Sequence, residues 1–327
     1  MAEEHLDPLW IEHGYGTRFQ GFQNLMRHRI RDVLLVSSLY DLYLFEEEGR
    51  FDELISNEYQ SLNLSHTPEL TRVSSGKEAI ALAKDERRFD LILTTLHVED
   101  MTAVRLATLA REAGVRIPII LLAYDSRELK DLRAQNCTEA FDRVFVWQGD
   151  FRLIVGIIKH LEDRMNVDHD TRLVGVQSIL FIEDNIHYYS TLLPILYTEL
   201  LSQSQRLVSE GINLSHKFLR TVARPKILFC RTYEEAWNYF EKYREHILGI
   251  ISDIDFPREG KPDHGAGIRF AKAARQENPE LPIMLQSLTS DYEAEARDLR
   301  LSFMPKDSPN PALLLRRFMT EYFSFGD

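Results

Sequence analysis

Four short apolar runs in the second half of the chain are each followed closely by polar residues that could carry chemistry, namely Glu183 with Asp184, Asp253, Ser287 and Lys306. If the runs are parallel strands, their carboxyl ends meet at one edge of a sheet, where open α/β sheets bind ligands. Carboxylates packed together repel one another, and a hard cation such as Mg²⁺ neutralises them. An aspartate beside that cation can attack phosphorus and become an acyl phosphate. Because a lysine and a serine hydroxyl would stabilise the phosphoryl oxygens, the pattern predicts phosphoryl transfer to Asp253.

The elements that must position these residues are short and continuously apolar, as strands buried on both faces are. Such runs occur at 32–36, 90–93, 117–122, 144–146, 178–182, 226–230, 248–251, 281–285 and 301–303. Between them, segments such as 232–245 and 268–277 have apolar residues at helical spacing. Alternating strands and helices indicate βαβ units, and therefore parallel sheets with helices on both faces.

The two halves resemble each other, because the tetrapeptide Asn-Leu-Ser-His occurs at 63–66 and again at 213–216 and the strand ends recur in parallel. A helix over about 150–165 precedes a polar stretch, which we interpret as a linker. We therefore expect a helical N-terminal extension, a first domain, a linker and a second domain, at 1–29, 30–165, 166–176 and 177–327.

One segment contains a local conflict. Residues 186–201 have the pattern of an amphipathic helix, yet Pro194 lies inside it. Because an interior proline removes a hydrogen bond and clashes with the preceding turn, we expect the helix either to kink there or to begin near Leu192. The stretch 202–225 that follows is long for a connection in a compact α/β domain.

In this order, the residues resemble the receiver domain of two-component response regulators. The matching segments are Phe-Ile-Glu-Asp-Asn at 181–185, Ile-Ser-Asp-Ile-Asp-Phe-Pro at 251–257, Pro-Ile-Met-Leu-Gln-Ser at 282–287 and Phe-Met-Pro-Lys at 303–306. The resemblance implies two tandem, doubly wound, five-stranded parallel-sheet domains of the flavodoxin-like class. It makes Asp253 the phosphoacceptor and Glu183 with Asp184 the acidic pair that binds Mg²⁺ together with Asp253. The backbone carbonyl of Asp255 is implied as a further ligand.

The same resemblance places Ser287 at the switch hydroxyl, Phe303 at the switch aromatic residue and Lys306 at the family's lysine. The sequence departs from the pattern at Asp307, where receivers usually have proline, and in the long loop 258–267. Asp255 adds a further carboxyl group near the site, and we hypothesise that it slows or redirects attack by water on the phosphoryl group.

The first half has the same skeleton without this chemistry. The corresponding positions are Ser37 with Ser38, Thr95, Ala123 and Trp147. We therefore interpret this half as a pseudo-receiver, a folded interaction module that is not phosphorylated. The nearby acidic residues Asp41, Glu99 and Asp100 are expected to cap helices or to face solvent.

Composition limits the partners and the compartment. A formal net charge of -12 repels phosphate backbones, so we expect no nucleic-acid partner. Two distant cysteines are typical of a reducing compartment, and neither a signal peptide nor a membrane span is recognisable, so we predict a cytoplasmic protein without a membrane partner. The segments 36–41, 223–228 and 322–327 resemble bacterial proteins in which a receiver region precedes a phosphoenolpyruvate/pyruvate-binding domain.

These observations predict a phosphorelay response regulator and not an enzyme, apart from catalysis of its own phosphorylation and dephosphorylation. The implied partner is a histidine kinase or phosphotransfer protein. A homodimer and a downstream phosphoenolpyruvate/pyruvate-binding domain are further possibilities. We expect no cofactor-binding residues beyond the Mg²⁺ ligands. Two alternatives stand beside this interpretation. One is a phosphatase of the haloacid-dehalogenase type, whose nucleophile motif Asp253-Ile-Asp255 resembles. That family places its second acidic cluster after the lysine, whereas here Glu183 and Asp184 come before Asp253. The other is an unphosphorylated scaffold that regulates a phosphoenolpyruvate/pyruvate-utilising enzyme.

Overall fold

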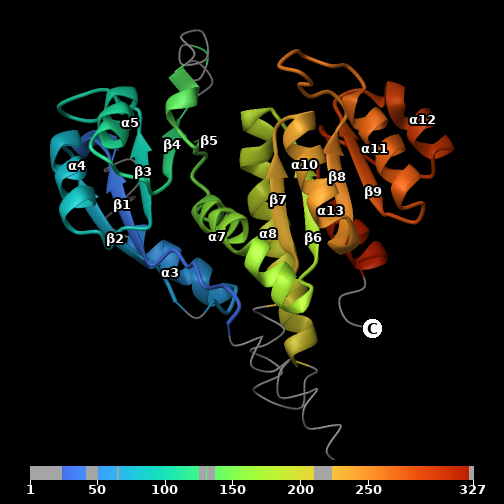
Figure 1. Cartoon of the computed structure of the whole chain (residues 1–327), viewed down its shortest axis with the longest axis horizontal. Helices are drawn as coiled ribbons and strands as arrows, with labels where there is room; N and C mark the ends of the chain where they lie inside the picture. Colours follow the sequence, from blue (N-terminus) through green and yellow to red (C-terminus); the bar gives the residue numbers. More distant parts are fainter. Residues whose placement is uncertain are drawn as a thin grey trace, which may run out of the picture. The chain divides into compact units, whose positions relative to one another are not determined.

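The computed structural model describes residues 24–41, 51–64, 66–124, 130, 137–209 and 223–323. Its strands form two sheets of five parallel strands (Figure 1). In the first sheet the order is β2-β1-β3-β4-β5, and the strands are β1 (Asp32–Val36), β2 (Glu69–Val73), β3 (Leu91–Thr95), β4 (Ile119–Ala123) and β5 (Arg143–Val146). In the second the order is β10-β9-β8-β6-β7, and the strands are β6 (Ser178–Ile182), β7 (Lys226–Cys230), β8 (Ile247–Asp253), β9 (Ile283–Ser287) and β10 (Ser302–Pro305).

Read in chain order, the two sheets have the same topology, with the first strand of each half between the second and the third. The prediction of two five-stranded, doubly wound parallel sheets of the flavodoxin-like class is confirmed. Five of the ten strands, β3, β4, β6, β7 and β9, are buried along their whole length, as continuous apolar runs predict. The strand that the runs did not predict is β2, an edge strand with the mixed sequence Glu-Leu-Thr-Arg-Val and only its last residue buried.

Helices connect successive strands in both halves. They are α3 (Phe51–Ser61), α4 (Gly76–Asp85), α5 (Ala103–Glu112), α7 (Arg152–Val174), α8 (Ile186–Ser209), α10 (Tyr233–Tyr243), α11 (Ala266–Glu277), α12 (Glu293–Asp298) and α13 (Pro311–Tyr322), with the 3₁₀ turns η1 (Cys137–Ala140), η2 (Arg244–His246) and η3 (Ser290–Tyr292). Side-chain caps start several of them, because an N-cap oxygen satisfies one of the free backbone N–H groups of the first turn; Ser75, Thr102, Thr232 and Asn310 act in this way.

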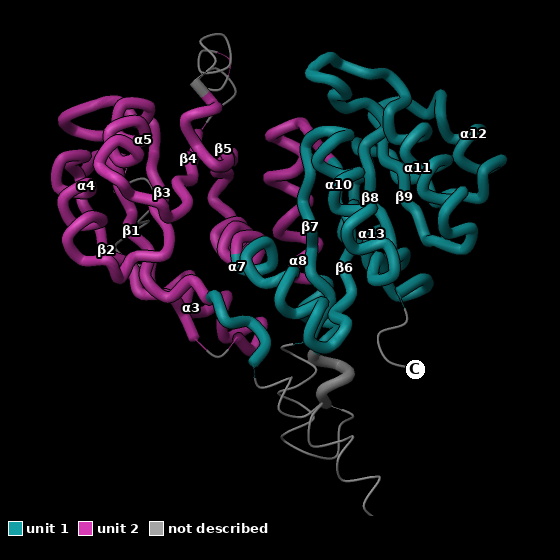
Figure 2. Tube along the Cα trace, in the orientation of Figure 1, with its two compact units in different colours: residues 1–28, 162–182, 199–327 teal, residues 29–161, 183–198 magenta. Residues whose placement is uncertain are grey.

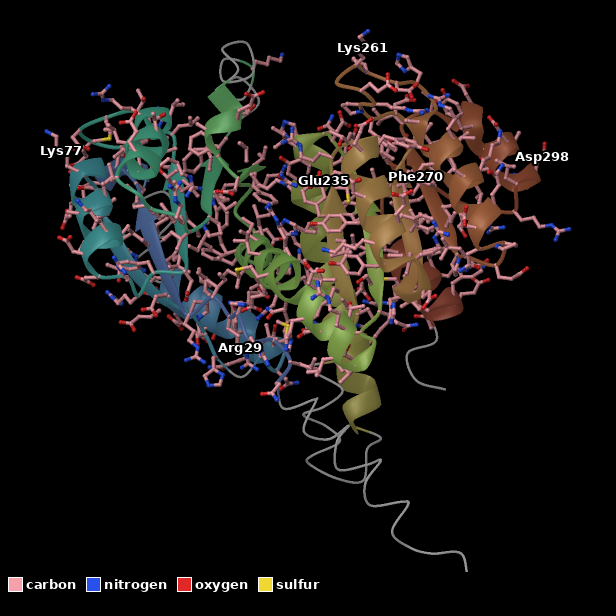
Figure 3. All side chains as sticks on the ribbon, in the orientation of Figure 1. Arg29, Lys77, Glu235, Lys261, Phe270 and Asp298 are labelled. Carbon is pink, nitrogen blue, oxygen red and sulfur yellow. The ribbon has the colours of Figure 1, made fainter. Side chains whose placement is uncertain are left out.

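Aromatic residues dominate one part of the second core. Phe270 of α11, labelled in Figure 3, is fully buried. It packs edge-on against Tyr233, Trp237 and Phe240 of α10. This packing holds α10 and α11 side by side, and α11 starts just after the loop that follows β8. The aromatic cluster therefore fixes the helix that follows the strand of the predicted acceptor, Asp253.

The helix that precedes the second half is longer than predicted. We expected it to end near residue 165 and a linker to follow, but α7 continues to Val174. Two of the polar residues that suggested a linker are fully buried and bonded: Asn166 donates to the His28 carbonyl oxygen at 2.6 Å, and Asp170 lies 2.9 Å from the Lys226 ammonium. Polar side chains on a helix suggest exposure unless their partners are known, and these partners are distant in sequence.

The helix that contains Pro194 begins at Ile186, so a start near Leu192 is excluded. Pro194 lies where α7 and α8 approach each other, since a Cβ atom built on Gly156 would lie 3.4 Å from Pro194 Cα.

Two earlier expectations fall wholly or partly outside the described residues. Of the predicted N-terminal helical extension, residues 1–23 lie outside the described residues, and residues 24–29 form no helix. Residues 210–222, which include the second Asn-Leu-Ser-His, also lie outside them.

The chain divides into two compact units (Figure 2). One consists of residues 1–28, 162–182 and 199–327, and the other of residues 29–161 and 183–198. The first half of α8, though it follows the second-half strand β6, thus belongs to the unit of the first sheet. Among the described residues, we find no helix whose length and apolar character would let it span a membrane.

Candidate functional site

Three carboxyl groups lie together where β6 and β8 end. The two strands are neighbours in register, with Ile182 opposite Ser252, so Glu183 follows β6 at the level of Asp253. One oxygen of each of Glu183, Asp184 and Asp253 lies within 4.8 Å of the others. Glu183 is fully buried and Asp253 is 6% exposed. The structure thus brings the predicted acidic pair and the predicted acceptor into one cluster.

The lysine and the serine predicted for the site come from the next two strands. Pro305 of β10 pairs with Ser287 of β9, and the Lys306 N–H donates to the Ser287 carbonyl oxygen at 2.8 Å. This register directs Lys306 toward the acidic cluster, where its Nζ lies 2.7 Å from Asp253 Oδ2. The Ser287 hydroxyl oxygen accepts from the Thr289 N–H at 3.2 Å, so its own hydrogen can still be donated to a ligand.

The charge of Asp253 is held in a nearly dry environment. Burial raises the pKa of Asp253 above its ordinary value, and the Lys306 ammonium opposes that rise. The other oxygen, Oδ1, accepts from the Ile254 N–H at 2.7 Å. The carboxylate is therefore fixed by a cation on one side and by backbone on the other.

The donor set of the cluster fits a hard divalent cation. Three carboxylates with oxygens within 4.8 Å of one another can share one cation, and oxygen ligands are those that Mg²⁺ prefers. Among the described residues this is the one group of three or more His, Cys, Asp or Glu side chains that could hold a metal.

The additional carboxylate of Asp255 holds the following loop. Its Oδ1 accepts from the Gly265 N–H at 2.8 Å, and its Oδ2 lies 3.6 Å from His264 Nδ1. The loop is fixed at its other end by Arg258, whose guanidinium lies 4.6 Å from the ring centroid of Tyr233. This long loop, whose tip carries Lys261 (Figure 3), is thus attached both to Asp255 and to α10.

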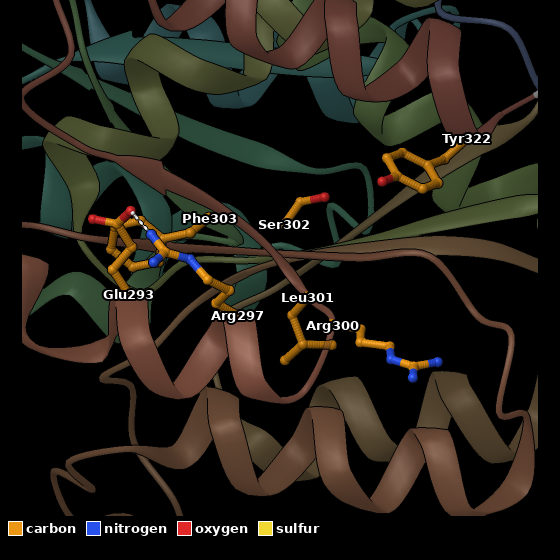
Figure 4. Close-up of a pocket in the computed structure, with 7 residues that line it drawn as sticks. All are labelled: Glu293, Arg297, Arg300, Leu301, Ser302, Phe303 and Tyr322. Atoms are coloured by element: carbon orange, nitrogen blue, oxygen red, sulfur yellow. Dashed lines mark hydrogen bonds and ion pairs between the residues drawn. The ribbon is translucent and has the colours of Figure 1, made fainter.

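The predicted switch residue Phe303 lies in β10 and is partly exposed at the edge of the second core. It borders a surface hollow of about 400 Å³ between α12, β10 and α13 (Figure 4). Arg297, Arg300 and Tyr322 also line this hollow. Phe303 therefore has space on its outer side.

At the carboxyl ends of the strands in the first sheet, the corresponding residues are bonded to nearby backbone. The His97 carbonyl oxygen accepts from the Ser38 N–H at 2.7 Å and from Thr95 Oγ1 at 3.0 Å. Trp147 is buried, and its backbone N–H donates to the Ala123 carbonyl oxygen at 2.7 Å. These contacts leave hydroxyl and aromatic groups where the second sheet has carboxylates and an ammonium.

The three acidic residues near this edge behave differently. Asp100 caps α4, because its carboxylate accepts from the N–H groups of Gly76 at 2.6 Å and Lys77 at 3.2 Å, and Glu99 is exposed. The expectation was wrong for Asp41, which is only 3% exposed, with Oδ2 3.5 Å from His97 Nδ1. Its N–H donates to Ser38 Oγ at 3.0 Å, and this turn brings the side chain inward.

One residue of the site gave no chemical signal in the sequence. Gly267, in the first turn of α11, donates its N–H to the Ile254 carbonyl oxygen at 2.8 Å. A Cβ atom there would lie 2.1 Å from the carbonyl oxygen of Asp253. In the sequence, Gly267 is the last residue of the long loop 258–267, just before the helical pattern of 268–277, and a glycine at that position was the only available hint of this close approach.

No protein-family model and no curated protein matches the chain. Among solved structures, the receiver domain of the Francisella response regulator 1452 is 14% identical with a TM-score of 0.31, over 41% of this chain and 98% of that one. Two structures assigned as two-component system response regulator/GGDEF domain proteins are 13% and 12% identical, with TM-scores of 0.36 and 0.35, each over 90% of this chain and 98% of the other. Likenesses this distant assign no activity to this chain.

Proposed function

We propose that the chain is a phosphorelay response regulator whose second domain is phosphorylated on Asp253. The observation that carries the proposal is the 2.7 Å ion pair between Lys306 and Asp253 beside the cluster of three carboxylates. A buried aspartate that is fixed by an ammonium and lies next to a cation site is arranged to accept a phosphoryl group. The first domain, whose corresponding residues are bonded to nearby backbone, is proposed to be a pseudo-receiver.

In the proposed reaction, an Asp253 oxygen attacks the phosphorus of a phosphohistidine on a histidine kinase or phosphotransfer protein. The P–N bond breaks, and the imidazole leaves with the bonding electrons and takes up a proton. Bound Mg²⁺, held by Glu183, Asp184, Asp253 and the Asp255 carbonyl oxygen, would supply positive charge to the phosphoryl oxygens. Lys306 moves from the carboxylate to one of these oxygens, since Asp253 has given up its charge.

The phosphorylated state differs from the free one by a local change of charge that biases two conformations. The Ser287 hydroxyl donates to a phosphoryl oxygen, and Phe303 turns inward from the hollow beside α12. This shifts the surface of α12, β10 and α13, which we propose a partner recognises. The partner that responds to this surface would be a second copy of the chain or a downstream phosphoenolpyruvate/pyruvate-binding domain. We also propose that the protein is cytoplasmic.

The test is the intact mass of the protein after incubation with acetyl phosphate and Mg²⁺. We expect one phosphoryl adduct on the wild type and on Asp255→Asn, which keeps an acceptor for Gly265, but none on Asp253→Asn. Asp184→Asn should weaken Mg²⁺ binding and slow adduct formation. Continuous release of phosphate without an adduct would favour the phosphatase alternative, and an adduct that persists in Asp253→Asn would refute the assignment.

A further inference from the structure

The strand β5 lies at the edge of the first sheet and has one row of backbone groups outside the ladder. The Trp147 N–H, just after β5, donates to Ala123 of β4. Because backbone groups of a parallel strand alternate between its two sides, the Val146 N–H and the Val144 carbonyl oxygen point away from the sheet. An uncovered edge of this kind is open to pairing with other chains.

The first half of α8 covers this edge. Ser190 Oγ accepts from the Val146 N–H at 2.9 Å, and the Tyr189 hydroxyl donates to the Val144 carbonyl oxygen. Tyr189 is fully buried and Ser190 is 5% exposed. The Tyr189 ring also packs edge-on against Phe145, with centroids 5.3 Å apart. All of these residues belong to one compact unit, so the helix is an integral part of the first domain's structure.

The same helix starts at the acidic site. Glu183 Oε1 accepts from the Asn185 N–H at 3.0 Å, and Asn185 Oδ1 accepts from the His187 N–H at 3.0 Å, which caps the helix. The Asn185 carbonyl oxygen accepts from the Tyr189 N–H at 3.0 Å. Three hydrogen bonds, joined through the covalent structure of Asn185 and Tyr189, therefore link the Glu183 carboxylate to the Val144 carbonyl oxygen of β5.

We propose that occupation of the acidic site by a divalent cation is transmitted to β5 through the first half of α8, so that the first domain is an output of the second. The inference rests on the cation site of the proposed function. Without a cation, the carboxylates of Glu183, Asp184 and Asp253 repel one another next to the first turn of α8. A bound cation removes that repulsion, which stabilises the turn and the contacts that Tyr189 and Ser190 make with β5.

Amide hydrogen exchange of the full-length protein, read at Val146 during a Mg²⁺ titration, tests this coupling. Allosteric couplings usually change an equilibrium severalfold or more, so we expect exchange at Val146 to slow by about fivefold at saturation. Tyr189→Phe and Ser190→Ala should lose the slowing at Val146 and still bind Mg²⁺, with an affinity, measured by calorimetry, that falls by no more than about the same fivefold factor, because coupling is reciprocal. Ser204→Ala is the matched control, because Ser204 lies in the same helix and its hydroxyl donates to the Leu200 carbonyl oxygen of that helix; it should behave as wild type.

Two results would overturn the inference. If Mg²⁺ binds and exchange at Val146 does not change, or slows equally in Tyr189→Phe and Ser190→Ala, the site is not coupled to β5 along this helix. If calorimetry detects no Mg²⁺ binding to the wild type, the cation site fails and the proposed function fails with it. The affinity measurement therefore separates failure of the coupling from failure of the site.

Discussion

At the residue scale, the position of the acceptor depends on a residue without a side chain. The first turn of α11 passes so close to the end of β8 that a Cβ atom on Gly267 would lie 2.1 Å from the Asp253 carbonyl oxygen and 2.9 Å from Ile254 Cα. Backbone atoms cannot move aside as a flexible side chain can. A methyl group at position 267 would therefore displace the segment that carries the acceptor.

We predict that Gly267→Ala slows phosphorylation of Asp253 by about tenfold or more and lowers the free energy of unfolding by about 1–3 kcal/mol, as overpacking does. Adduct formation by mass spectrometry and urea denaturation measure the two effects. Gly149→Ala is the control, because Gly149 has a φ of +80° with no atom within 4 Å of its Cβ position. It should cost about 1–2 kcal/mol through its left-handed backbone alone and leave phosphorylation unchanged. Equal loss of phosphorylation in both variants would contradict the steric explanation.

At the scale of elements, α8 contributes to two units. Residues 186–198 belong to the unit of the first sheet, and residues 199–209 belong to the unit of the second. Its two halves also have different polar partners: Ser190 bonds to Val146, whereas Glu199 forms a bidentate ion pair with Arg316 of α13, both distances being 2.7 Å. A single helix therefore stabilises two cores that are separate in sequence.

This arrangement predicts that two matched substitutions in α8 destabilise different sheets. Leu193 and Leu200 are both fully buried. Leu193→Ala should destabilise the first sheet and Leu200→Ala the second, each by about 2–5 kcal/mol, which is typical of a cavity left by leucine. Hydrogen exchange of β3 and β4 compared with that of β8 and β9 distinguishes the two. If both variants weaken the same sheet, the division of α8 between the units is wrong.

At the scale of the whole molecule, a buried ionic cluster attaches α7 to the second sheet. Arg224 forms a bidentate pair with Asp163, at 2.8 and 2.9 Å, and the Ile227 N–H donates to the same carboxylate at 2.9 Å. Lys226 is fully buried and lies 2.9 Å from Asp170. The Met26 N–H donates to Asp170 at 3.2 Å, so the segment that precedes the first sheet is attached to α7 in the same unit.

This cluster makes stability depend on acid pH. Burial acts to raise the pKa of Asp163, but Arg224 and Lys226 outweigh it, and the pKa lies below its ordinary value of 3.8. Because the folded state favours the ionised form, the stabilisation is complete above that ordinary value and is lost as the pH falls through the lower, folded pKa. We predict that Asp163→Asn loses about 3–5 kcal/mol of unfolding free energy at neutral pH, because it breaks a buried pair.

Urea denaturation at several pH values checks this prediction. The difference between the wild type and Asp163→Asn should shrink below pH 3.8 as the wild-type carboxylate takes up its proton. Asp298→Asn is the control, since Asp298 is exposed at the end of α12 (Figure 3) and should unfold as the wild type does. A constant difference at all pH values would mean that the ion pair is not the cause.

The sequence by itself determined the parallel sheets and the residues that meet at their edge. A strand that is buried on both faces must be apolar throughout, so its end is marked by the first polar residues, such as Glu183 or Asp253. Parallel strands place these ends on the same side, which makes the convergence of Lys306 with Asp253 predictable without coordinates. The edge strand β2 was not predicted, because a strand that is partly exposed has no continuous apolar run.

Only the tertiary structure decided which elements belong together around that edge. Asp170 lies in the polar stretch 166–176, which suggested a linker, because its partner Lys226 lies more than fifty residues further along the chain. Likewise, nothing in the order of the elements indicates that residues 186–198, which follow a strand of the second sheet, cover β5, the edge strand of the first sheet. Local patterns report how each segment buries its apolar face, whereas the partner of a buried polar group depends on contacts between segments that are distant in sequence.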